Sequence, residues 1–203
     1  MTNAYTVIIL DFETTGLSPD MGDRAIEIGA VRIENGIITE RFQELMNPGQ
    51  PISSFIEDYT GITNNMLYNA PPCEEVMNDF ANFIDGYNLV AHNASFDKRF
   101  LDAELNNISR TYSGKFACSM LASRRIYQNA PDHKLGTLIN YTNIPSDGTF
   151  HRALYDSEMT TKLWISMLDE LDEQYNLQSI PFTLIQQLTK IPKKSVHDFL
   201  ENW

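Results

Sequence analysis

Residues 7–17 read Val7-Ile8-Ile9-Leu10-Asp11-Phe12-Glu13-Thr14-Thr15-Gly16-Leu17, an apolar run that ends in two carboxylates and a turn. Four consecutive large apolar residues are typical of a strand buried on both faces, which does not normally carry acids unless they are paired or bind a cation. Residues i and i+2 of a strand point to the same side, so the Asp11 and Glu13 carboxylates converge. A strand that frays into solvent at Leu10, leaving two surface acids, explains this stretch alone about as well.

The chain has the size and composition of one globular domain with a small appendage. It has 203 residues, of which 42% are hydrophobic, enough for one well-buried core. No run approaches the roughly 18 apolar residues of a membrane span, and the first residues lack the pattern of a secretory signal. We therefore expect a cytoplasmic protein without membrane contact, whose Cys73 and Cys118 are ordinary thiols.

The net charge of −12 argues against a broad basic face for nucleic acid, because such binding normally rests on neutralisation of phosphates by Lys and Arg. Any nucleic acid should therefore be bound locally. An acidic site filled with metal ions can hold one strand end while the surrounding surface stays anionic. Weak processivity of the chain alone, or recruitment by a partner, is the expected consequence.

The patterns of strands and helices are typical of an α/β domain. Residues 5–46 predict three consecutive antiparallel strands, with Asn35-Gly36 as a two-residue hairpin turn. Leu89-Val90-Ala91 predicts a short strand, and another near Phe116 to Ser119 is hard to separate from helix by pattern alone. Helices are expected over residues 74–85, 96–107, 120–127, 135–141 and 151–171.

Two stretches are predicted to be loops. Residues 50–73 are polar apart from a few apolar points such as Phe55 and Ile62, and are either a functional loop or a surface loop held by those side chains. Pro145-Ser146-Asp147-Gly148 is a strong loop signal that leads into the last long helix.

Two further acids follow histidines. Asp97 lies in the first turn of the helix after His92, where a lone acid is most simply a contact with the helix dipole or a cap. His151 and Asp156 are five residues apart, which on a straight helix separates them by roughly 140°. If both serve one site, His151 must lie on the loop or in the first turn, where it can bend over the acids.

Together these motifs carry a resemblance. Asp11-Phe12-Glu13-Thr14-Thr15-Gly16-Leu17, His92-Asn93-Ala94-Ser95-Phe96-Asp97, and His151 with Asp156 resemble the three motifs of the DEDDh exonucleases. The chain is similar to DnaQ-like 3′→5′ exonucleases, which include the proofreading epsilon subunits of bacterial DNA polymerase III. The resemblance implies a ribonuclease H-like fold, with a central mixed five-stranded sheet flanked by helices. It divides the chain into an exonuclease domain over 1–171 and a short helical C-terminal extension over 172–203.

Carried over by position, the resemblance implies that Asp11, Glu13, Asp97 and Asp156 bind metal, Asp97 partly through a water, and that His151 is the general base. Oxygen ligands favour Mg²⁺ or Mn²⁺, and two such ions roughly 3.5–4 Å apart can hold the attacking and leaving oxygens of a phosphodiester. A histidine's ordinary pKa of about 6.5 lies near operating pH.

Substrate-binding residues are expected around the acids. Backbone N–H groups of the turn after the first strand could meet a terminal phosphate or 3′-hydroxyl, and apolar side chains could stack on terminal bases. For Phe96, packing in the core is at least as good an explanation. The full set, part of it implied by the resemblance, is Thr14, Thr15, Gly16, Leu17, Gly61, Ile62, Asn93 and Phe96.

The function expected from the resemblance is metal-dependent 3′→5′ removal of nucleotides from single-stranded DNA ends, in proofreading or DNA repair. An exoribonuclease of the same family and a non-catalytic nucleic-acid- or polymerase-binding module are the alternatives. Residues 172–203 carry Lys190, Lys193 and Lys194 and are the least acidic part of the chain. They either pack on the domain or form a tail that docks on a DNA polymerase subunit, as proofreading subunits of this family do.

Overall fold

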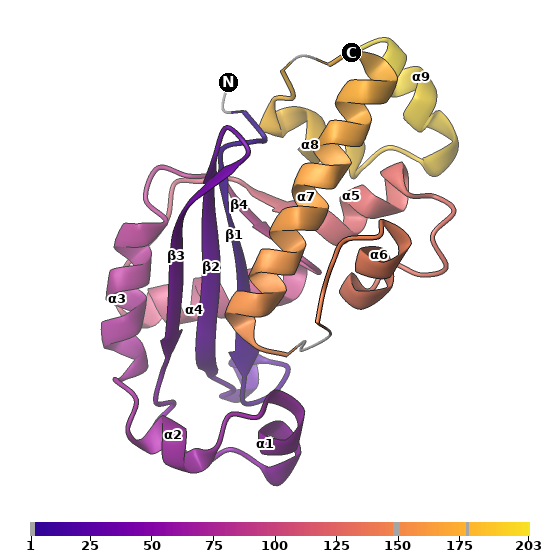
Figure 1. Ribbon diagram of the computed structural model, residues 1–203. Coiled ribbons are helices and arrows are strands. Elements are labelled where there is room, and N and C mark those ends of the chain that lie inside the picture. The colour runs from indigo at the N-terminus through magenta and orange to yellow at the C-terminus, as the bar shows by residue number, and fades with distance from the viewer. Residues whose placement is uncertain (1–2, 148–150, 178) are drawn as a thin grey trace.

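The computed structural model describes residues 3–147, 151–177 and 179–203, so Gly148 of the expected loop lies outside the described residues. A five-stranded sheet lies between two helical layers (Figure 1). Its strands are β1 (Val7–Thr14), β2 (Ala25–Glu34), β3 (Ile37–Leu45), β4 (Leu89–Ala91) and β5 (Phe116–Cys118). The order is β3-β2-β1-β4-β5, antiparallel from β3 to β1 and parallel from β1 to β5. The mixed sheet predicted from the sequence is confirmed.

Helices cover both faces of this sheet, and two short ones lie beyond the end of β1 (Figure 1). They are α1 (Ser54–Thr60), α2 (Asn64–Tyr68), α3 (Cys73–Phe83), α4 (Ser95–Asn107), α5 (Ser119–Ile126), α6 (Leu135–Tyr141), α7 (Ala153–Tyr175), α8 (Phe182–Leu188) and α9 (Val196–Glu201). Two 3-10 helices are η1 (Pro19–Met21) and η2 (Lys193–Ser195). Among the residues described, no helix is both long and apolar enough to cross a membrane.

The polar segment 50–73 is not the continuous loop expected from the sequence, because it contains α1 and α2. Ser53 Oγ accepts a hydrogen bond from the Ile56 N–H at 3.4 Å, and Thr63 Oγ1 accepts one from the Met66 N–H at 3.2 Å. These caps satisfy backbone donors that a short helix leaves unpaired. Each of these helices buries a single residue, Thr60 in α1 and Leu67 in α2, so neither shows a repeating apolar face.

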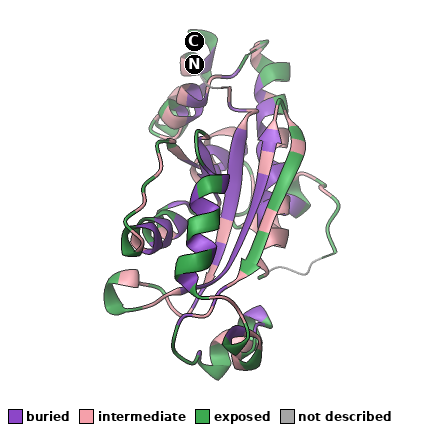
Figure 2. Ribbon diagram, turned by 90° about the vertical axis from the view of Figure 1, so that its left-hand side faces the viewer, coloured by how far each residue is buried: buried purple, intermediate pink, exposed green. Residues whose placement is uncertain are grey.

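Strand β1 divides the apolar core into two. Val7 and Ile9 belong to the cluster on the α7 side, whereas Ile8 and Leu10 belong to the cluster formed with α3 and α4. The next odd-numbered positions of the strand are its two acids, so both carboxylates lie on the α7 side. In Figure 2 the central strands are buried, and exposed positions gather on the edge strand β3.

Gly29 allows the first turn of α7 to lie directly on the sheet. It is paired with Asp11 in the antiparallel register of β1 and β2. A Cβ atom at this position would overlap the backbone of Ala153 and Leu154. The Ser157 hydroxyl also donates to the Gly29 carbonyl at 2.8 Å. The close approach therefore brings the beginning of α7 beside the acids of β1.

The C-terminal extension is folded onto the domain. Helix α7 continues past Leu171 to Tyr175, so the boundary expected at residue 171 falls within a helix. Ala4 N–H donates to the Ile180 carbonyl at 2.8 Å, and the Phe182 ring lies 6.4 Å from the Trp164 ring. The buried residues of the extension belong to the same cluster as α7: Leu184, Ile185, Leu188, Val196 and Leu200.

We expect Phe182→Ala to lower the free energy of unfolding by about 3–5 kcal/mol, because it leaves a cavity in this cluster. Phe182 is 1% exposed. Urea unfolding followed by circular dichroism measures the change. Trp203→Ala is the matched control, since that side chain is 45% exposed and should cost less than about 1 kcal/mol. Equal losses from both variants would show that the extension is not integrated in the core.

Candidate active site

Three carboxylates meet at the end of β1. One oxygen from each of Asp11, Glu13 and Asp156 lies within 4.8 Å of the others. Strand β1 supplies two of them from one face, and the second turn of α7 supplies Asp156, which is only 8% exposed. A cluster of carboxylate oxygens without thiolate or imidazole ligands suits hard cations such as Mg²⁺ or Mn²⁺. The donor set therefore fits the divalent ions expected from the sequence.

Asp97 joins these acids from α4. It lies in the first turn of that helix, is 2% exposed, and its Oδ1 accepts a hydrogen bond from the Phe12 N–H at 3.2 Å. The parallel pairing of Ile8 with Leu89 and of Ile9 with Val90 brings the end of β4 to this point. Asp97 is not one of the three closest carboxylates, yet its charge helps to raise the pKa of Asp11.

Burial raises the pKa values of all four acids, and the charges of neighbouring carboxylates add to this for Asp11, Glu13 and Asp156. The pKa of Asp11 is held well above its ordinary value by burial first, and then by the charges of Asp97, Asp156 and Glu13. Burial, and then the charges of Asp156, Glu27 and Asp97, raise the pKa of Glu13 to about 8, and burial raises the pKa of Asp97 to about 7. Burial also raises the pKa of Asp156, although two backbone N–H groups oppose it. Without a cation, the cluster retains protons near neutral pH.

His151 lies on the loop that precedes α7, as its spacing from Asp156 predicted. Its φ is +74°, its side chain is exposed, and α7 begins two residues later. The N–H groups of His151 and Arg152 both donate to Asp156 Oδ2, at 2.7 and 3.1 Å. The Tyr59 ring from α1 packs against the imidazole, with 4.0 Å between the ring centroids. The backbone bond and the ring contact hold His151 beside the acids.

Glu27 is a buried acid on β2 that the sequence motifs do not include. It is 0% exposed and lies opposite Glu13 in the strand register. Its carboxylate accepts from Arg152 Nη2 at 2.8 Å, from Arg152 Nε at 3.2 Å and from the Ala153 N–H at 3.0 Å. Gln43 Nε2 donates to it at 2.9 Å. Glu27 therefore binds both the residue after His151 and the first N–H of α7.

A cavity of about 890 Å³ opens over the acids. The predicted substrate-binding residues that line it are Thr14, Thr15, Gly16, Leu17, Asn93 and Phe96. The Thr15 N–H is not available to a substrate, because it donates to the Arg24 carbonyl at 2.9 Å. Phe96 is half-buried, with its ring 5.0 Å from that of Phe100, so it serves both core and cavity.

Gly61 and Ile62 are not among the residues that line this cavity. Ile62 is 0% exposed and packs in a small cluster with Ile26, Ile52 and Leu67, so it cannot stack on a base in this structure. Gly61 has a φ of +72° and ends α1, a position that favours glycine. The expectation that these two residues touch the nucleotide is therefore not supported by their placement.

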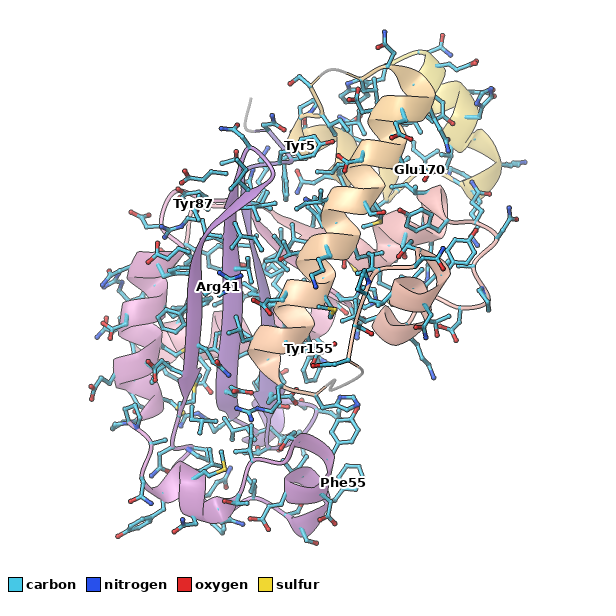
Figure 3. The ribbon with its side chains drawn as sticks, viewed as in Figure 1. Tyr5, Arg41, Phe55, Tyr87, Tyr155 and Glu170 are labelled. Carbon is cyan, nitrogen blue, oxygen red and sulfur yellow. The ribbon has the colours of Figure 1, made fainter. Side chains whose placement is uncertain are left out.

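Two exposed aromatic rings of α1 line the cavity where Gly61 and Ile62 do not. Phe55 and Tyr59 are 70% and 51% exposed, and their rings are stacked with centroids 5.9 Å apart. Both line the cavity, and Figure 3 shows Phe55 on α1 beyond the end of the sheet. Their spacing of one helical turn was the available signal. It was missed because the segment was interpreted as a loop.

His92 forms part of the cavity wall but is fully engaged in hydrogen bonds. Its Nε2 lies 2.9 Å from the His133 carbonyl, to which it donates, and its Nδ1 lies 2.9 Å from the Ser119 hydroxyl. Burial lowers the pKa of His92 to about 4. A neutral imidazole bonded at both nitrogens orders the corner between β4 and α6 rather than moving protons.

Known proteins match this chain over most of its length. The family described as "Exonuclease" matches residues 8–164. The DNA polymerase III PolC-type of Caldanaerobacter subterraneus subsp. tengcongensis is 40% identical over 166 residues, 82% of this chain and 12% of that protein. The 3′-5′ exonuclease DinG of Bacillus subtilis is 34% identical over 200 residues, 97% of this chain and 20% of that protein. The chain thus spans no more than a fifth of these two relatives.

Solved structures have the same fold. Exonuclease X, solved in complex with 5′ overhanging duplex DNA, is 26% identical with a TM-score of 0.70, covering 90% of this chain and 99% of that one. The nuclease domain of 3′hExo, a DEDDh family member bound to rAMP, has a TM-score of 0.70 at 21% identity, covering 83% and 95%. The second likeness concerns the fold alone. The ribonuclease H-like fold expected from the sequence is confirmed.

We expect Mg²⁺ to raise the melting temperature more at about pH 8.5 than at about pH 6. The pKa values of Glu13 and Asp97, about 8 and about 7, exceed those of the unfolded chain. The metal-free protein therefore loses stability as pH rises through 7 to 8, and a bound cation offsets this loss. Thermal scans with and without Mg²⁺ measure it. Asp11→Asn should abolish the shift; an equal shift at both pH values would contradict the prediction.

We expect Glu27→Gln and Arg152→Met each to lower the free energy of unfolding by about 2–4 kcal/mol. This loss is smaller than for a fully buried ion pair, because Arg152 is partly exposed to solvent. The double variant should lose less than the sum. Urea unfolding measures all three. Arg41→Met is the matched control, since Arg41 pairs with Glu158 at the surface (Figure 3 labels Arg41) and should cost no more than about 1 kcal/mol. Strict additivity would show that Glu27 and Arg152 do not depend on each other.

Proposed function

The chain belongs to the exonuclease family, and from this premise we propose that it hydrolyses phosphodiester bonds one nucleotide at a time from the 3′ end of single-stranded DNA. The observation that carries the proposal is the convergence of Asp11, Glu13 and Asp156, with Asp97 beside them and His151 above, in one cavity. DNA is favoured over RNA because several relatives that are 35–40% identical are named as DNA polymerases and Exonuclease X is bound to DNA.

Asp11, Glu13 and Asp156 would hold the divalent cations, Mg²⁺ or Mn²⁺, with Asp97 contributing from α4 in part through a water. When bound, two such ions would neutralise the charge that develops on the phosphodiester during hydrolysis. The protein contributes a fixed arrangement of oxygens: β1 holds two of them, and Asp156 is oriented by the backbone N–H groups of His151 and Arg152. Little reorganisation is then needed when the substrate arrives.

His151 would take the proton from the attacking water. A general base must lie within reach of the proton that it removes, and an exposed imidazole beside the acids can satisfy this requirement. Its position depends on Tyr59, which packs on the ring, and on Glu27, which binds the neighbouring Arg152. We assign these two as positioning residues.

The terminal nucleotides would lie between the turn after β1 and helix α1. Leu17 is 76% exposed on one side of the cavity, and the stacked rings of Phe55 and Tyr59 line the other. Stacking between apolar faces tolerates any base and requires an unpaired strand. This arrangement supports single-stranded ends as the substrate.

From the same family relationship we also propose that the protein acts in DNA replication or repair. Proofreading next to a polymerase is proposed because relatives of this chain include PolC-type DNA polymerases. Docking on a polymerase through residues 172–203 stays a prediction, and most apolar side chains of that extension are already used in packing on α7, α5 and β5.

A time course on 5′-labelled single-stranded DNA and RNA of matched sequence, with Mn²⁺ or with chelator, tests the proposed function. We expect a ladder that shortens from the 3′ end, faster on DNA and absent without metal. Faster cleavage of RNA would show that the substrate is RNA rather than DNA, and the proposed hydrolysis from the 3′ end would still hold. No cleavage of either strand by folded, metal-binding protein would overturn the proposal and favour a binding module.

We expect His151→Ala to lower the turnover number by about 10²–10⁴ with an unchanged circular dichroism spectrum, because the general base is lost. The same assay measures it under single-turnover conditions. His197→Ala is the matched control, since His197 is exposed on α9, contacts Tyr175 and Glu201 at the surface, and does not line the cavity. A His151→Ala rate within about threefold of the unmodified protein would remove His151 from the mechanism.

A further inference from the structure

Positive charge is concentrated in two short segments of this acidic chain. Residues 124–134 and 190–194 contain six of the fifteen Lys and Arg residues but only one of the 27 Asp and Glu residues, Asp132. The six cations, called here the basic track, are Arg124, Arg125, Lys134, Lys190, Lys193 and Lys194. The rest of the chain is correspondingly more acidic than the net charge of −12 suggests.

The fold brings the two segments side by side. Arg125 Nε donates to the Ile191 carbonyl at 3.1 Å, and Gln128 Nε2 donates to the Lys193 carbonyl at 3.1 Å. These bonds attach η2 of the C-terminal extension to the end of α5. In Figure 1, α5, α6, α8 and α9 lie together on one side of α7. Lys190, Lys193 and Lys194 are exposed there.

The basic track reaches the cavity of the active site. Lys134 lines that cavity, and the preceding residue, His133, accepts through its carbonyl the hydrogen bond of His92. Burial lowers the pKa of the His133 imidazole, and the charges of Lys193 and Arg124 lower it further. Lys134 therefore lies at the edge of the cavity, and the hydrogen bonds between α5 and the extension place the other cations of the track on the same side of the protein.

These cations are not neutralised by the protein. Within the described ranges, none of the six forms an ion pair with a carboxylate, whereas Arg24, Arg32, Arg41, Lys98 and Arg152 all do. Crowding like charges without counter-charges costs folding energy. The four lysines of the track are exposed, and its two arginines are half-buried. Exposed, unpaired cations next to an active site are typical of a surface that binds phosphates.

We propose that the basic track binds the phosphate backbone of the single strand whose 3′ end lies in the cavity. This inference rests on the proposed function and assigns the C-terminal extension a role in substrate binding. Contacts between Lys or Arg and phosphates are independent of sequence, which suits a strand that must move by one nucleotide per cycle. They also explain how a chain with a net charge of −12 can hold a polyanion: the attraction is local.

The test compares Lys193→Glu/Lys194→Glu with a control, Lys115→Glu/Lys162→Glu, in which two exposed lysines outside the track change the net charge equally. The substrates are single-stranded DNA of about 30 nucleotides, longer than one binding site, and the p-nitrophenyl ester of thymidine 5′-monophosphate, which reaches only the cavity. Fluorescence anisotropy with the labelled oligonucleotide in chelator measures binding independently of catalysis.

We expect the track variant to raise the KM and Kd for the oligonucleotide by about 10–100-fold, with kcat and the ester kinetics unchanged. The slope of log Kd against log salt should fall by about 1.4, since each lost phosphate contact contributes about 0.7 on a single strand. The control variant should change neither constant by more than about threefold.

Equal effects of the two variants, or an unchanged Kd for the track variant, would overturn the inference. If the track variant lost binding to a DNA polymerase but kept its Kd for DNA, the inference would be overturned, and the track would be a docking surface for protein. If the unmodified protein cleaves neither substrate, the proposed function fails, and the anisotropy measurement still decides whether the track binds DNA.

Discussion

Repulsion among buried carboxylates is the constraint on which the rest of this structure depends. Asp11 and Glu13 point from one face of β1 toward Asp156, and burial raises the pKa values of all three, with the charges of neighbouring carboxylates raising them further. Such a cluster persists only if surrounding groups hold it in place. Backbone N–H groups do so for Asp97 and Asp156, and the packing of α7 on Gly29 sets the distance between helix and strand.

The residues just before α7 link three parts of the site. His151 offers its side chain to the cavity while its N–H binds Asp156, and Arg152 binds Asp156 through its backbone and Glu27 through its guanidinium. The proposed base His151, the carboxylate of Asp156 and the buried acid of β2 are therefore coupled through two consecutive residues. Helix α1 adds a second support, because Tyr59 packs on the imidazole.

Negative and positive charge are concentrated in different places in and around the cavity. The centre of the site is acidic, which suits cations and repels phosphates, whereas the basic track begins at one edge of the cavity. The C-terminal extension uses its two sides differently: Phe182 and Leu188 complete the core beside α7, and Lys193 and Lys194 face solvent. An anionic protein can thus bind a polyanion, because screening confines electrostatic attraction to about 10 Å.

The sequence alone determined whatever depends on local geometry. The period of two in β1 placed Asp11 and Glu13 on one side, and the spacing of His151 from Asp156 required a loop position. Only the tertiary structure revealed that Glu27 holds Arg152, 125 residues away, that Tyr59 packs on His151, and that Ile62 is buried. Contacts between distant segments leave no periodic signal, and α1 and α2 each bury a single residue, so neither shows a repeating apolar face.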